Sequence, residues 1–319
     1  MRNTEKICIG IVFVATLLCC LLATEFVFEN FIGEFDELEQ LKTSLENETD
    51  IIYFGDSVVK SPTAGGVEQM LSDVSGKSVK IVAHEAYHLG VYEAAVNFIS
   101  KQEKKPEVIV IPINLRSFSP EWDTRPQYQF QNEITKLNES EDLLIGLWVR
   151  VTNLFGNSDE KKLLDDMTWK QENVYFGKNI VGRVNEFEFL IHGDEEDIEE
   201  LVKKKFIYQY GYLLNEKSNK MDSLKNIIKK CKEMNSELVL YITPIDVENG
   251  KIHAGEEFLE IIKNNTTLLE KIGIDNGANI IDLSFDLEHE KFEYVFIPNE
   301  HLKEEGLQYV AEKISEKLN

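Results

Sequence analysis

The stretch IIYFGDSVV at residues 51–59 decides the expected fold. The apolar run 51–54 is typical of a strand buried on both faces, and Gly55 permits a sharp exit from its carboxyl end. Asp56 and Ser57 follow at once, so the exit carries a carboxylate and a hydroxyl. A serine there can act as a nucleophile if a base reaches it; the alternative is that Asp56 or Ser57 only caps a turn or helix.

Similar apolar runs recur along the chain and alternate with amphipathic stretches of helical period. This alternation predicts an α/β fold, a doubly wound parallel sheet with helices on both faces and the strand order 2-1-3-4-5. The runs are 51–54, 78–83, 108–113, 238–243 and 279–283, and the helical stretches are 90–104, 221–234, 256–273 and 303–318.

The interval between the third and fourth runs is long and rich in aromatic residues, so it is not a bare linker. We expect a mainly helical insertion over about residues 120–220, within one domain over 50–319. Such an insertion would lie over the carboxyl ends of the strands, where ligands bind in sheets of this kind.

Residues 7–28 are apolar enough to predict a transmembrane anchor. Arg2 and Lys6 precede this segment and acidic residues follow it, which predicts a cytoplasmic tail over 1–6 and an extracytoplasmic remainder, in a single-pass protein of the cell membrane. Residues 29–49 are acidic and polar, which indicates a juxtamembrane stalk that is partly helical. The rival interpretation of 7–28 is a cleaved signal peptide.

Charge and cysteine content exclude some classes of function. The formal net charge is −23, so the surface would repel the phosphates of nucleic acid. Three of the 4 cysteines lie in the apolar N-terminal segment, which leaves Cys231 alone in the rest of the chain. No disulfide framework is possible there, and Cys231 at an apolar helical position is expected to be a small buried hydrophobe.

Three further residues can join Ser57 at the carboxyl edge of the sheet. Asn114 follows the third run, and its side-chain amide can donate to a developing oxyanion; a turn-forming role is equally open. His301 precedes the last helical stretch and could face Ser57 as a base. Gly90 could offer a second backbone donor, or could merely open the helix that follows it.

Together these residues resemble the SGNH (GDSL-like) hydrolase and acyltransferase superfamily, over about residues 50–119 and 238–319. Gly55, Asp56 and Ser57 are similar to its nucleophile block and His301 to its terminal histidine block, while Gly90 and Asn114 are similar to its glycine and asparagine blocks. The anchor, INLRSFSPEW (113–122), YITPI (241–245) and EHLKEEG (300–306) look like membrane-anchored members linked to O-acylation of cell-surface polymers, such as the partner proteins of teichoic-acid D-alanylation.

The resemblance implies a flavodoxin-like three-layer α/β/α sandwich with no cofactor or metal. It also implies Ser57 as nucleophile, supported by Asp56, and His301 as base, with the Ser57 N–H, the Gly90 N–H and Asn114 as oxyanion donors. The family's usual aspartate lies three residues before the histidine, and Pro298 stands at that position here. The group that orients His301 is therefore left open among Glu300, a backbone carbonyl and an acid from elsewhere.

The other histidines have competing interpretations. His84 and His88 have a spacing of four, which could hold a metal on one helix face, but no third ligand is evident. We therefore favour residues that are exposed or at the rim of the site. His192, His253 and His289 lie among charged residues and are expected to be solvated.

The function expected from this resemblance is extracytoplasmic, serine-dependent transfer of a small acyl group such as acetyl to a cell-surface polysaccharide or glycopolymer. A multi-spanning membrane-bound O-acyltransferase is the expected partner, because an external domain has no acetyl-CoA at hand. One alternative is a carbohydrate esterase with the same residues. A second, favoured by Pro298 and the net charge, is a catalytically degenerate scaffold or binding protein of a surface-polymer complex.

Overall fold

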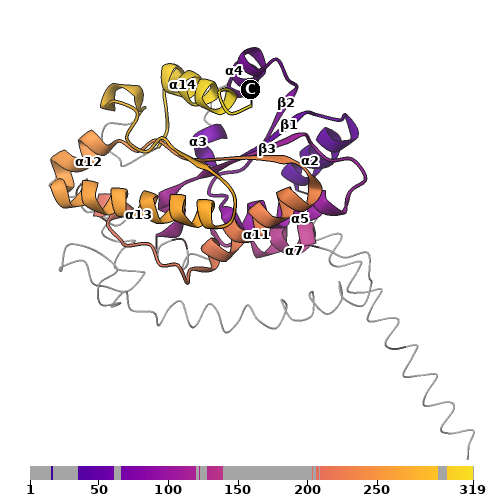
Figure 1. Cartoon of the computed structure of the whole chain (residues 1–319), viewed down its shortest axis with the longest axis horizontal. Helices are drawn as coiled ribbons and strands as arrows, with labels where there is room; N and C mark the ends of the chain where they lie inside the picture. Colours follow the sequence, from indigo (N-terminus) through magenta and orange to yellow (C-terminus); the bar gives the residue numbers. More distant parts are fainter. Residues whose placement is uncertain are drawn as a thin grey trace, which may run out of the picture.

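The computed structural model describes residues 16, 35–60, 66–119, 122, 128–138, 203, 206–207, 209–293 and 300–318 (Figure 1). Five parallel strands form one sheet in the order β2-β1-β3-β4-β5. The prediction of a parallel α/β sheet is confirmed, and the strand order is the expected one. The strands are β1 (Ile51–Gly55), β2 (Val79–Ala83), β3 (Val108–Ile113), β4 (Glu237–Ile242) and β5 (Ile280–Asp282).

The central strands are buried on both faces, which explains their continuous apolar sequence. Every residue of β1 and β3 is buried. Alternate residues enter two separate cores, so that Ile52 and Phe54 face one layer of helices while Ile51 and Tyr53 face the other.

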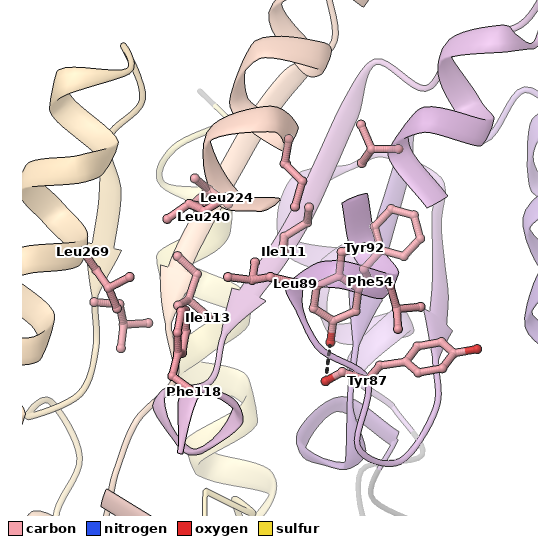
Figure 2. Close-up of a cluster of buried hydrophobic side chains, with 14 of the residues drawn as sticks. Phe54, Tyr87, Leu89, Tyr92, Ile111, Ile113, Phe118, Leu224, Leu240 and Leu269 are labelled. Carbon is pink, nitrogen blue, oxygen red and sulfur yellow. Dashed lines mark hydrogen bonds between the residues drawn. The ribbon is translucent and has the colours of Figure 1, made fainter. Parts of the chain in front are cut away.

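The larger core packs α5 (Leu89–Lys101), α7 (Gln131–Asn138), α11 (Asn219–Met234) and α13 (Glu256–Asp275) on one face. Figure 2 shows part of this core, where Phe54 and Ile111 of the sheet lie near Leu89 and Tyr92 of α5. The smaller core packs α4 (Val67–Ser75) and α14 (Glu304–Ser315) on the opposite face, above the sheet in Figure 1. The remaining short elements are α3 (Ser57–Lys60), η2 (Leu115–Phe118), α12 (Val247–Ala254) and η4 (His289–Lys291).

A helix precedes the first strand, and it belongs to the folded domain. This helix, α2 (Asp36–Glu46), buries Leu38, Leu41 and Leu45 in the larger core. Its acidic side chains at 36, 39 and 46 are exposed, whereas Glu37 is buried. The expectation of an acidic stalk is therefore wrong for residues 36–46. The three leucines recur at helical spacing and outweigh the acidic composition, because a helix needs only one apolar face to pack.

Several expectations fall outside the described residues. These are the anchor over 7–28 apart from Thr16, most of the insertion over 120–220, and Pro298. In the part of the chain that the structure describes, no helix is both long and apolar enough to cross a membrane. Cys231 is buried in the larger core as expected, and burial raises the pKa of its thiol to about 12.

Candidate active site

The exit of β1 places Asp56 and Ser57 at the carboxyl edge of the sheet. Val59 of α3 packs so closely on Gly55 that a Cβ there would lie 2.6 Å from the Cβ of Val59. Only glycine therefore allows this tight exit. Ser57 begins α3 and is half-buried, whereas Asp56 is 1% exposed.

Both carboxylate oxygens of Asp56 accept hydrogen bonds. The N–H of Val58 donates to Oδ1 at 2.9 Å, and Nδ2 of Asn114 donates to Oδ2 at 2.8 Å. The bond from Asn114 links the ends of β1 and β3, which are neighbours in the sheet. Asp56 thus fixes the turn that carries Ser57, which is the capping role left open from the sequence.

Asn114 itself is held by the short helix that follows it. Its Oδ1 accepts from the N–H of Arg116 at 3.0 Å, and its carbonyl accepts from the Ser117 hydroxyl at 2.7 Å. One N–H of the Asn114 amide is used by Asp56, and an amide carries two. An oxyanion would therefore accept from the second N–H of the Asn114 amide nitrogen.

The pKa of Asp56 is raised to about 6. Burial is the largest cause, and the nearby carboxylate of Glu300 adds to it. The hydrogen bonds from Val58 and Asn114 and the positive charge of His301 oppose the rise. Asp56, Glu300 and His301 therefore lie within electrostatic reach of one another, although the last two follow β1 by more than two hundred residues in the sequence.

Glu300 is buried and faces an arginine and a tyrosine. Its Oε2 lies 4.0 Å from Nη1 of Arg116, and its charge helps burial to raise the pKa of Tyr210 well above the usual value. A side-chain interaction between the Tyr210 hydroxyl and Glu300 also contributes to that rise, and among the described residues neither carboxylate oxygen of Glu300 has hydrogen-bond geometry to the His301 ring. In this conformation Glu300 therefore does not hydrogen-bond to the imidazole of His301.

Arg116 extends from η2 across this region. Its guanidinium carbon lies 5.9 Å from the centre of the Trp122 ring, which is a cation–π geometry. Arg116 also lowers the pKa of Tyr210, and so partly offsets the effect of Glu300. The carboxylate of Glu300, the guanidinium of Arg116 and the phenol of Tyr210 thus form a polar cluster near Asp56.

His301 is held in place through its backbone. Its carbonyl accepts from the N–H of Glu293 at 2.9 Å, and the next residue, Leu302, forms an antiparallel bridge with Phe292. Both Phe292 and Leu302 are buried in the smaller core. The segment before α14 is therefore anchored to η4 and its continuation.

Gly90 lies in the first turn of α5, and its N–H donates to Nδ1 of His88 at 3.0 Å. The role that this structure supports is the alternative one, a residue that opens the helix. A Cβ at Gly90 would lie 2.9 Å from Cε1 of His88, so the imidazole also requires glycine here. The oxyanion role would require this hydrogen bond to break.

His88 is a buried helix cap, so the expectation of an exposed or rim position is wrong for it. Burial lowers its pKa to about 3, with a further contribution from the positive charge of Lys220. His84 lies in the loop after β2, where its ring packs against Tyr87 and Phe130. The two histidines do not share a helix face, and within the described ranges no group of three His, Cys, Asp or Glu side chains could hold a metal.

Two other histidines differ from the expectation of solvated side chains. His253 stacks on the buried ring of Phe206, with centroids 6.1 Å apart. His289 contributes Nδ1 to a 2.7 Å contact with Oδ2 of Asp246, a carboxylate that is 1% exposed. His192 lies outside the described residues. The signal for Asp246 was its position just after β4, at the edge that carries Ser57 and Asn114.

The chemistry available at this edge is that of a hydroxyl and an amide at the exits of β1 and β3 and an imidazole before α14, beside two buried carboxylates. Ser57 and Asn114 lie on the same edge of the sheet, and His301 lies within electrostatic reach of Asp56 there, while Gly90 lies beside it with its N–H engaged. Sequence patterns did not point to Arg116, Tyr210 or Asp246 as site residues, and His289 was expected to be solvated. No protein-family model matches this chain, and a search of curated proteins finds no match either.

Proposed function

We propose that this chain transfers acyl groups through a serine nucleophile, Ser57, with His301 as its general base. The observation that carries the proposal is the convergence of Asp56, Asn114 and His301 at the exits of β1 and β3 and before α14. These groups come from distant parts of the chain: Asn114 bonds to Asp56, the residue before half-buried Ser57, and His301 lies within electrostatic reach of Asp56. Convergence of this kind at the carboxyl edge of a parallel sheet is characteristic of active sites.

The proposed reaction has two halves. Oγ of Ser57 attacks the carbonyl carbon of an acyl ester while its proton passes to the His301 imidazole. The bond from that carbon to the leaving oxygen then breaks, and His301 protonates the departing alcohol. In the second half an acceptor hydroxyl, or water, loses its proton to His301, attacks the acyl-enzyme and releases Ser57 with its proton restored.

The developing oxyanion would be stabilised by two donors, the backbone N–H of Ser57 and the second N–H of the Asn114 amide. Asp56 supports this arrangement, because it holds the amide of Asn114 at 2.8 Å and the N–H of Val58 at 2.9 Å. The Gly90 N–H is a donor in this proposal only if a substrate displaces His88.

The wider setting follows from the resemblance to SGNH proteins and is part of the proposal. The domain adopts the flavodoxin-like sandwich of that superfamily and is held outside the cell membrane by an anchor over residues 7–28. Its acyl group is small, such as acetyl, and its acceptor is a hydroxyl of a cell-surface polysaccharide or glycopolymer. A multi-spanning membrane-bound O-acyltransferase supplies the acyl group. With water as acceptor, the same residues would make a carbohydrate esterase.

The second candidate is a scaffold or binding protein of a surface-polymer complex that has lost its catalytic activity. The engaged N–H of Gly90 favours it, because one of the three family donors is occupied by His88. The absence of a hydrogen bond between Glu300 and His301 favours it as well, since Glu300 then does not orient the base in this conformation.

The test measures release and transfer of acetyl groups by the purified full-length chain. An O-acetylated polysaccharide is incubated with the protein, and free acetate is compared with acetyl moved to an added unacetylated oligosaccharide. Transfer that disappears in Ser57→Ala supports the acyltransferase, and acetate release alone supports the esterase. If the wild type produces neither while it binds the polymer, the scaffold is correct.

A further inference from the structure

A buried aspartate and a histidine meet at the exits of β4 and β5, apart from the residues assigned to acyl transfer. Oδ2 of Asp246 lies 2.7 Å from Nδ1 of His289. The side chain of Asp246 is fully buried, while that of His289 is 30% exposed. The two residues are 43 positions apart in the sequence, so the contact joins separate segments of the fold.

Asp246 is fixed firmly within its own segment. Its Oδ1 accepts from the N–H of Asn249 at 3.1 Å and thereby caps the start of α12. The N–H of Ile245 donates to the carbonyl of Ser284, which ties the exit of β4 to that of β5. The carboxylate of Asp246 therefore has a fixed position, and a segment that bonds to it is fixed as well.

His289 attaches the segment that contains η4 to this point with two contacts. Its ring meets Asp246, and its backbone N–H donates to Oε2 of Glu248 at 3.1 Å. Both acceptors belong to the start of α12. A hydrogen bond between a buried carboxylate and an imidazole is among the stronger ones in proteins. A charged acceptor shielded from water interacts more strongly with its donor than a solvated one does.

The segment that His289 fixes is the one that holds His301. Glu293 donates to the carbonyl of His301 at 2.9 Å, and the N–H of Lys303 donates to the carbonyl of Lys291 at 2.8 Å. An antiparallel bridge between Phe292 and Leu302 joins the segment after η4 to the segment before α14, and both residues are buried. The ammonium of Lys303 also donates to the carbonyl of Glu290 at 2.8 Å.

We propose that Asp246 and His289 are positioning residues that set the place of His301 through residues 291–293. This inference rests on the proposed function, because it assigns His301 the role of base. It gives one way in which an imidazole that does not donate to Glu300 is held over the carboxyl edge of the sheet. The backbone of residues 291–293 holds the backbone of His301, and the contact at the exit of β4 fixes residues 291–293.

The first experiment observes His301 directly and needs no enzymatic activity. The full-length chain is labelled with ¹⁵N-histidine, and the ring signals of its 6 histidines are recorded by NMR, with the His301 signal assigned from His301→Asn. His289→Ala removes the donor to Asp246, and Asp246→Asn removes the charged acceptor while it keeps an oxygen for the N–H of Asn249. We expect both to shift or broaden the His301 signals.

A conservative variant separates positioning from general loss of structure. The amide nitrogen of Asn occupies the place of Nδ1, so His289→Asn should restore the wild-type His301 signals. His253→Ala is the matched control, because this histidine lies on α12 but packs on Phe206 rather than on the segment before His301. Unchanged His301 signals in His289→Ala and Asp246→Asn, with intact melting curves, would overturn the proposal.

The second experiment measures turnover of p-nitrophenyl acetate by the same variants. Misplacement of the base should lower kcat by roughly 10- to 100-fold in His289→Ala with little change in KM, and His289→Asn should recover most of it. If Ser57→Ala turns over the ester as well as the wild type, the proposed function fails, while the NMR result still decides whether Asp246 and His289 position His301. A change confined to KM would contradict the positioning role.

Discussion

Asn114 donates from Nδ2 to Oδ2 of Asp56 across 2.8 Å, and this hydrogen bond joins the carboxyl ends of β3 and β1. Both side chains are buried, Asp56 more deeply than Asn114. The bond aligns the amide with the turn that presents Ser57. A residue proposed as an oxyanion donor is thus also a structural partner of the residue that precedes the nucleophile.

Asn114→Ala should therefore affect both catalysis and stability. Loss of one oxyanion donor raises the barrier by about 3 kcal/mol. The same change leaves a buried oxygen of Asp56 without its donor, which lowers the free energy of unfolding by about 1–3 kcal/mol. Ester turnover and urea unfolding measure the two effects. Asn226→Ala is the control, because that amide bonds to Glu93 at the surface; equal effects of the two variants would contradict the assignment.

Asp56→Asn should change how stability depends on pH. The folded pKa of Asp56 is raised from 3.8 to about 6, so its favourable contribution is complete below the unfolded pKa and is lost as the pH rises through 6. The loss amounts to about 3 kcal/mol at roughly 1.4 kcal/mol per pKa unit. Asparagine does not ionise, so the unfolding free energy of the variant, relative to that of the wild type, should rise by most of that amount, about 2 kcal/mol, between pH 4 and pH 7.5.

Urea titrations of both proteins at several pH values measure this difference. A gap between variant and wild type that stays constant from pH 4 to pH 7.5 would show that Asp56 titrates normally. The burial of its carboxylate beside Glu300 would then not raise its pKa.

Glu300→Gln distinguishes an orienting carboxylate from an electrostatic neighbour. Glu300 faces Arg116 and Tyr210 and does not hydrogen-bond to His301, so we expect ester turnover to fall less than about tenfold, equivalent to a barrier change below about 1.4 kcal/mol. Removal of the negative charge should also lower the pKa of Asp56, since Glu300 raises it. A carboxyl ¹³C titration reports that pKa.

Glu305→Gln provides the control for this experiment, because the Glu305 side chain is exposed and pairs with Lys291 on the same segment. A loss of several orders of magnitude in Glu300→Gln alone would make Glu300 the third member of a triad. It would mean that the carboxylate turns toward His301 during catalysis.

Leu41→Ala tests whether α2 belongs to the domain. Leu41 is 1% exposed in the larger core, so truncation should lower the free energy of unfolding by about 2–5 kcal/mol. Lys42→Ala, at a half-buried position on the same helix, is the control variant. If Leu41→Ala unfolds like the wild type, residues 36–46 act as a stalk after all.

The sheet could be predicted because its strands are buried on both faces. The runs of β1 and β3 contain nothing but apolar side chains and glycine or proline, and such continuity is typical of parallel strands covered by helices on both sides. The alternation with helices then determined the expected order, and the order brought Asn114 and Ser57 to one edge. The prediction of α14 rested in the same way on its regular apolar stripe.

The partners of polar groups could not be predicted in this way. Whether the N–H of Gly90 faces a substrate or His88 depends on a side-chain rotamer that no spacing encodes. The contact between Asp246 and His289 joins distant segments, and the local charges around His289 pointed to solvent instead. The acidic composition of residues 29–49 likewise indicated a solvated segment, although the leucines of α2 are spaced to pack one face of the helix on the domain.

The most direct test of the central role of Ser57 is covalent labelling with a fluorophosphonate probe, which reacts with an activated serine hydroxyl. The full-length chain is treated with the probe, and the modified peptide is identified by mass spectrometry. We predict labelling at Ser57 in the wild type, none in Ser57→Ala, and strongly slowed labelling in folded His301→Ala, because an unassisted hydroxyl is a poor nucleophile. A wild-type chain that is folded yet unlabelled at Ser57 would contradict the role of Ser57 as nucleophile.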